Sequence, residues 1–148
     1  MADVSIQIKG LKELEQKLEK MGQEFAAKSI VASAYSANKK MQDSIKEAIQ
    51  NDGLVDTGLL QSSITRKKII YPKDGRVVII TGVNKRTRGV DRQGRPRVPW
   101  RYANVLESKY NFTKDGVEAA RQSVVDSFVA SLARKIKKYE KNNPNPKQ

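Results

Sequence analysis

The chain has 148 residues, enough for one domain of ordinary size, and only 38% of them are hydrophobic. Its 29 basic residues against 16 acidic ones give a net charge of +13, which favours nucleic acid or an acidic protein as partner. The sequence has no cysteine and no histidine, which excludes disulfides and removes the commonest general base and metal ligand. No secretory signal and no membrane-spanning run is visible. We therefore expect a protein of the host cytoplasm with one modest core and no membrane contact.

The first half of the chain predicts a strand followed by two helices. Apolar and polar residues alternate over residues 4–9, which is typical of a half-buried strand. Leucines at helical spacing predict a short helix up to Met21, and a long helix is predicted from about Glu24 to Gln50. Its small side chains suggest close packing within the domain or against another subunit. The expected buried stripe of the long helix is Ile30, Ala34, Ala37, Met41, Ile45 and Ala48.

The second half predicts a hairpin, a loop and a final helix. Strands are expected at residues 64–71 and 76–83, the second in the interior of the sheet because both its faces are β-branched. Residues 84–99 predict a long loop that becomes ordered only on assembly. The last helix, capped by Thr113 with Asp115 in its first turn, is expected to end near Lys141. Its expected buried stripe is Val117, Ala120, Val124, Phe128, Leu132, Ile136 and Tyr139.

These elements predict a single α+β domain over residues 1–141, with residues 142–148 as a disordered polar tail. In this fold a small antiparallel sheet of about three to four strands packs against the long helix and the C-terminal helix.

Residue patterns typical of enzymes are nearly absent. The segment Asp56–Gly58 resembles the Asp-Thr-Gly of aspartic proteases, but the residues after it do not continue that motif, and a tight turn is favoured. No glycine-rich phosphate loop is present. Glu107 and Tyr102 are better explained as a hydrogen-bonded structural pair than as an acid–base pair. We predict no catalytic residue, no metal site, no cofactor and no enzymatic activity.

The strongest charged feature is the loop after the hairpin. Seven basic residues accompany one acid, Asp91, which gives a local charge of +6. Arginine binds phosphates through paired hydrogen bonds, so the loop is a candidate surface for DNA or for a partner protein. A loop that is merely basic and solvated remains an alternative. Trp100 could stack on bases, although Pro99-Trp100 favours a loop fixed to the core. The basic residues are Lys85, Arg86, Arg88, Arg92, Arg95, Arg97 and Arg101.

The order of these pieces resembles the small head–tail joining, or tail-completion, proteins of phages with long non-contractile tails. The resemblance begins with a strand and a Gly-Leu-x-x-Leu helix over residues 6–18, followed by an Ala-rich helix. It continues with a Thr-Gly-x-Leu-x-x-Ser-Ile-like segment over residues 57–64 and a Tyr-Ala-x-x-x-Glu segment over residues 102–107. Residues 108–112 depart from the family's usual continuation. The motif positions are Thr57, Gly58, Leu59, Ser63, Tyr102, Ala103 and Glu107.

The resemblance implies a structural protein of the virion neck, made in the host cytoplasm and assembled as a hexameric ring. Its implied partners are other copies of the chain, the head connector or stopper proteins, and the tail terminator or tail tube. Contact with genomic DNA in the channel is also implied. The alternative from the residues alone is a stand-alone basic nucleic-acid-binding protein. A small hydrolase or nuclease is disfavoured because histidine and cysteine are missing.

Overall fold

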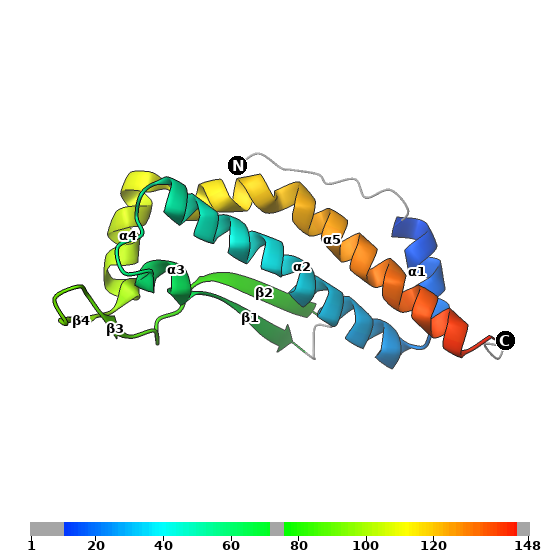
Figure 1. The fold of residues 1–148 in the computed structure, drawn as a ribbon. Coiled ribbons are helices and arrows are strands. Elements are labelled where there is room, and N and C mark those ends of the chain that lie inside the picture. The colour runs from blue at the N-terminus through cyan, green and yellow to red at the C-terminus, as the bar shows by residue number, and fades with distance from the viewer. Residues whose placement is uncertain (1–10, 72–75, 145–148) are drawn as a thin grey trace.

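The computed structural model describes residues 11–71 and 76–144, which form an elongated α+β fold (Figure 1). The predicted strand over residues 4–9 and the turn over residues 72–75 lie outside the described residues. The long helices confirm the prediction almost to the residue. The elements are α1 Leu11–Lys20, α2 Gln23–Asn51, α3 Leu59–Ser63, β1 Ile64–Tyr71, β2 Arg76–Val83, β3 Gly89–Val90, β4 Pro96–Arg97, α4 Pro99–Tyr110 and α5 Phe112–Asn142.

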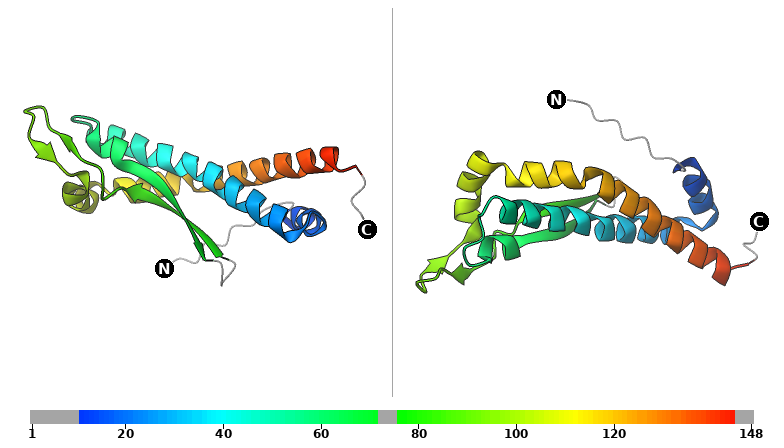
Figure 2. Two further views of the ribbon diagram at one scale, coloured as in Figure 1. Left: turned by 90° about the horizontal axis from the view of Figure 1, so that it is seen from below. Right: turned by 45° about the horizontal axis from the view of Figure 1, so that its top comes forward.

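Two long helices, α2 and α5, run side by side in opposite directions along the molecule (Figure 1, Figure 2). At 1.5 Å per residue, each is about 45 Å long. The β1–β2 hairpin packs against α2, while α1 lies across one end of the helix pair and α4 turns the chain at the other end. The helix pair therefore sets the length of the molecule, and the loops gather at its ends.

The helices approach most closely at Gly116 of α5. A Cβ atom at this position would lie only 2.6 Å from the Cα atom of Ile45 on α2. Ala37 and Ala120 are also buried. Contacts of this kind require small residues, which explains an error in the predicted stripe of α2: Ile30 is 39% exposed, whereas Ser29 and Ser33 are buried.

The buried apolar side chains form two clusters along the helix pair, not the single core expected from the sequence. The larger cluster lies beside the hairpin and α4, and includes Ile45, Ile64 and Phe112. The smaller cluster joins Met21, at the end of α1, to Leu132 and Ile136 of α5. Small residues occupy the helix contact between them, so less apolar surface is buried in the middle than at the ends.

The hairpin pairs in the register that its alternation predicts, with Ile64 opposite Val83 and Tyr71 opposite Arg76. One face lies against α2: Arg66 Nε donates to Gln42 Oε1 at 2.9 Å, and Thr81 Oγ1 donates to Asn38 Oδ1 at 2.8 Å. The other face points away from α2, which leaves Ile80 49% exposed. Among the described residues β2 pairs with β1 alone, so the predicted interior position of β2 is not observed there.

A tight corner between α4 and α5 replaces the predicted cap at Thr113. Asn111 takes a left-handed conformation, with φ of 53°, and α5 begins at Phe112. The Glu107 carboxylate accepts hydrogen bonds from the backbone N–H of Thr113 at 2.9 Å and of Lys114 at 3.3 Å. Glu107 thus satisfies the free amides of the α5 N-terminus, while Asp115 lies in the first turn as expected.

None of the helices within residues 11–71 and 76–144 is both long enough and apolar enough to cross a bilayer.

Candidate interaction site

The basic loop is folded into a short hairpin, in contrast to the irregular, assembly-dependent loop predicted from the sequence. Strand β3 pairs with β4, with Gly89 opposite Arg97 and Val90 opposite Pro96. The turn between them is closed by hydrogen bonds from Asp91 N to Arg95 O and from Gly94 N to Asp91 O. Gly94 has a φ of 76°, a conformation that favours glycine.

The carboxylate of Asp91 holds this small hairpin together. Its Oδ1 atom accepts hydrogen bonds from the backbone N–H of Gln93 and Arg95, at 3.0 and 2.9 Å. Its Oδ2 atom accepts from the guanidinium groups of Arg95, at 2.7 Å, and Arg97, at 2.9 and 3.0 Å. The Asp91 side chain is only 8% exposed, and this burial raises its pKa. The hydrogen bonds from Arg95, Arg97 and Gln93 outweigh burial and lower the pKa of Asp91 to about 2.

The local charge of +6 therefore overstates how much of the loop faces outward. Arg95 and Arg97 are held by Asp91, and Arg92 forms an ion pair with Asp56 at 2.5 Å. The Arg88 guanidinium donates to the loop carbonyls of Lys85 and Thr87. Only Lys85, Arg86, Arg88 and Arg101 form no ion pair with a described carboxylate.

Trp100 fixes the start of α4 to the loop, as the sequence predicted. The Lys85 ammonium lies 4.3 Å from the centroid of the Trp100 ring, which is a cation–π contact.

We expect Asp91→Asn to loosen the hairpin without unfolding the protein. The amide cannot accept all the hydrogen bonds that the carboxylate accepts, and the hairpin lies outside both apolar clusters. Amide hydrogen exchange at Arg95 should become faster while the melting temperature stays nearly constant. Asp52→Asn removes the same charge and serves as the control. Unchanged exchange at Arg95 would contradict the role assigned to Asp91.

Acid should produce the same loosening in the wild-type protein. Because folding lowers the pKa of Asp91 to about 2, its contribution is complete above the unfolded value of about 4 and is lost as the pH falls through about 2.

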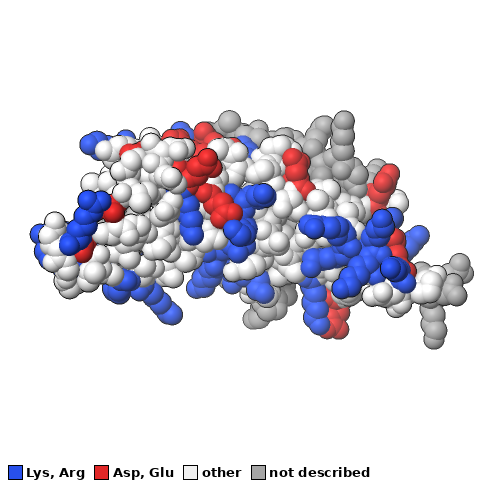
Figure 3. Space-filling model, viewed as in Figure 1, with Lys and Arg blue, Asp and Glu red and all other residues white. Residues whose placement is uncertain are grey.

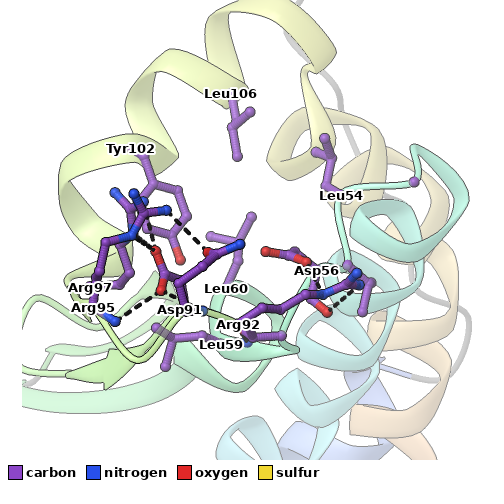
Figure 4. Close-up of a pocket in the computed structure, with 14 residues that line it drawn as sticks. Leu54, Asp56, Leu59, Leu60, Asp91, Arg92, Arg95, Arg97, Tyr102 and Leu106 are labelled. Carbon is purple, nitrogen blue, oxygen red and sulfur yellow. Dashed lines mark hydrogen bonds and ion pairs between the residues drawn. The ribbon is translucent and has the colours of Figure 1, made fainter.

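A pocket of about 600 Å³ lies between this hairpin, the loop before α3 and the side of α4 (Figure 4). Leu54, Leu60 and Leu106 form its apolar part, whereas Arg92 and the Asp91 cluster form its polar part. The sequence brought none of these groups together, because Asp56 and Arg92 are 36 residues apart and neither belongs to a recognisable motif. The pocket opens at the end of the molecule that carries α3, α4 and the small hairpin.

The motif positions surround this pocket, and the first group of them builds its wall. Gly58 has a φ of 73° and lets the chain turn into α3, while Thr57 Oγ1 accepts a hydrogen bond from Leu59 N at 3.3 Å. Leu59 packs so closely on Gly89 that a Cβ atom there would lie 2.5 Å from Leu59 Cδ1. The motif therefore joins the α3 turn to the basic hairpin.

The remaining motif positions are internal supports. Ser63 and Ala103 are buried, and Ser63 Oγ donates to Leu60 O at 2.5 Å. Tyr102 lines the pocket, and burial raises its pKa. Tyr102 and Glu107 share no hydrogen bond in the structure, since Glu107 caps α5; the hydrogen-bonded pair expected from the sequence is not formed. Within the departing segment, Phe112 fills the larger cluster and is 1% exposed.

The geometry does not assemble the acid pair of an aspartic protease. The Asp56 side chain is 65% exposed and paired with Arg92, and Asp91 is occupied by Arg95 and Arg97. Two carboxylates that share a proton require a dry site in which they face each other. Across residues 11–71 and 76–144, no three acidic side chains gather closely enough to hold a metal ion.

The fold and the pocket thus define a small basic α+β protein with a polar pocket at one end. No protein-family model matches the chain, and comparison with curated proteins and with solved structures finds no similar protein.

Proposed function

We propose that the chain is a structural protein of a phage or prophage virion, which joins the head connector to the tail by assembling as a hexameric ring. In this proposal it lies in the neck, between connector or stopper proteins and the tail terminator or tail tube. Its work is geometric, and no cofactor or catalytic step is needed. The resemblance of residues 6–18, 57–64 and 102–107 to the head–tail joining family supports the assignment.

The observation that carries the proposal is the amount of apolar surface that one copy leaves exposed. Large apolar side chains between 37% and 68% exposed occur on α2, on both strands of the hairpin, on β3 and on α4. They are Phe25, Ile30, Tyr35, Val55, Ile70, Tyr71, Ile80, Val90 and Val105. Scattered exposure is ordinary, but this distribution covers several sides of a thin molecule, as expected for a subunit with more than one neighbour.

Assembly can be tested by adding charge to these exposed positions. Ile80 and Val105 are 49% and 68% exposed, so Ile80→Lys and Val105→Lys should leave the melting temperature nearly unchanged. The double variant should shift the oligomer toward monomer in sedimentation velocity and should fail to restore head–tail joining to a deletion mutant. Gln50→Lys with Asn104→Lys adds equal charge at exposed polar positions and should behave like the wild type.

The deletion mutant itself tests the assignment to the neck. Without the gene, electron microscopy should show filled heads and separate tails. Normal joined virions, combined with a defect in DNA replication or lysis, would contradict the proposal. That result would favour the alternative, a stand-alone nucleic-acid-binding protein, for which the charge distribution of the β1–β2 hairpin is the relevant observation.

A further inference from the structure

The β1–β2 hairpin and the chain that leaves it have an unusual charge distribution. Residues 64–71 and 76–90 carry seven basic residues and no acidic residue. Elsewhere, basic side chains are mixed with acids, as in the pairs Lys28–Glu24, Lys39–Asp43 and Lys17–Glu140. Figure 3 shows cationic side chains outnumbering acidic ones on the face it presents. The hairpin is therefore a continuous source of positive potential that no acid on the same segments offsets.

Part of this charge lines a cleft of about 510 Å³ at the base of the hairpin. Register places Thr65 opposite Gly82 and Lys67 opposite Ile80, on the face that points away from α2. Lys85 and Arg86 complete the cleft on the side of the loop. A Cβ atom at Gly82 would meet nothing within 4 Å, so the floor of the cleft is open to a ligand. The cleft is thus a hollow between basic side chains with little bulk at its base.

The cations of this cleft differ from those of the basic loop in one decisive respect. Lys67 and Arg86 are exposed and form no ion pair with a described carboxylate, whereas Arg92, Arg95 and Arg97 are held by Asp56 and Asp91. An external anion at the loop hairpin must displace an internal carboxylate. At the cleft it displaces only water and counterions, so binding there is opposed less.

We propose that this cleft binds the phosphate backbone of duplex DNA, with Lys67, Lys85 and Arg86 as the contacting cations. A protein partner would require apolar or aromatic anchors in a well-packed pocket, and the cleft offers only Ile80 and Val83 among its lining residues. A phosphate backbone requires only accessible cations and room for close approach. The inference concerns one copy of the chain and does not depend on ring assembly.

The test is the salt dependence of binding by the purified full-length protein. Fluorescence anisotropy with a labelled duplex should give a linear fall of log K against log salt concentration, with a slope of about −0.9 per phosphate contact. Neutralising three contacts in the variant Lys67→Gln, Lys85→Gln and Arg86→Gln should make the slope shallower by about 2.7 and weaken binding at least tenfold at low salt. All three side chains are exposed, so the melting temperature should hold.

A matched control separates a site from general charge. The variant Lys137→Gln, Lys138→Gln and Lys141→Gln removes the same charge from the exposed end of α5, and should change the slope by less than about one. Equal effects of the two variants, or no effect of the cleft variant, would overturn the proposal. Polyglutamate supplies the other comparison: if it competes with duplex at equal charge and is equally weakened by the cleft variant, the cleft recognises acidic protein. Electron microscopy of the deletion mutant tests the neck assignment separately.

Discussion

Replacing Gly116 by alanine is expected to destabilise the protein, although alanine normally favours a helix over glycine by about 0.5–1 kcal/mol. The added Cβ atom would lie 2.6 Å from Ile45 Cα and 2.8 Å from Ile45 N. These are backbone atoms that no rotamer change can move, so α2 and α5 must separate. Overpacking typically costs about 1–3 kcal/mol, and Gly116→Leu should exceed this range because a longer side chain enlarges the separation.

Urea unfolding followed by circular dichroism measures this loss directly. Gly82→Ala is the control, because its Cβ atom meets nothing within 4 Å and Gly82 does not have a positive φ. We expect its free energy of unfolding to stay within about 0.5 kcal/mol of the wild type. If Gly116→Ala proves as stable as the wild type, the close approach of the helices at this point is incorrect.

Replacing Phe112 by alanine is expected to remove a large part of the stability of the fold. The Phe112 side chain is 1% exposed in the larger cluster, where it packs with residues of α2, α3 and α4. Truncating a buried phenylalanine costs about 3–5 kcal/mol, and the total stability of a domain is about 5–15 kcal/mol. The variant should therefore melt at a much lower temperature or populate the unfolded state at room temperature.

Phe25→Ala provides the comparison for this prediction. Phe25 is 37% exposed and touches the ring of Tyr139, with the centroids 4.6 Å apart. Its truncation removes less buried surface and should cost about 1 kcal/mol. Similar losses in the two variants, measured by chemical unfolding, would show that Phe112 does not anchor the cluster.

The elements of the fold were predictable because each has a local periodic signal. Alternation gave both strands of the large hairpin, and helical spacing gave the ends of α2 and α5 nearly to the residue. The buried face of α2 was predicted less well. Hydrophobicity favoured Ile30, but the neighbouring helix is so close that small residues such as Ser33 occupy the contact instead. Gly116 carries no apolar signal at all, although it sets the distance between the helices.

The candidate site was predictable only as a composition. The sequence identified the basic residues of the loop but not the hairpin that Asp91 organises, because a single carboxylate between many arginines does not indicate which of them it binds. The pair of Asp56 with Arg92 joins distant parts of the chain, and no periodic pattern links them. The roles of Glu107 and Thr113 were misassigned because a capping carboxylate from the preceding helix competes with a local cap.

The division of the buried side chains into two clusters has a consequence for how the molecule opens. Local unfolding proceeds through groups of residues that share buried contacts, and each cluster defines one such group. The end that contains α1 can fray and re-form while the hairpin end stays closed. Strain introduced at one end is then absorbed there, and the pocket and the basic cleft at the other end keep their shape.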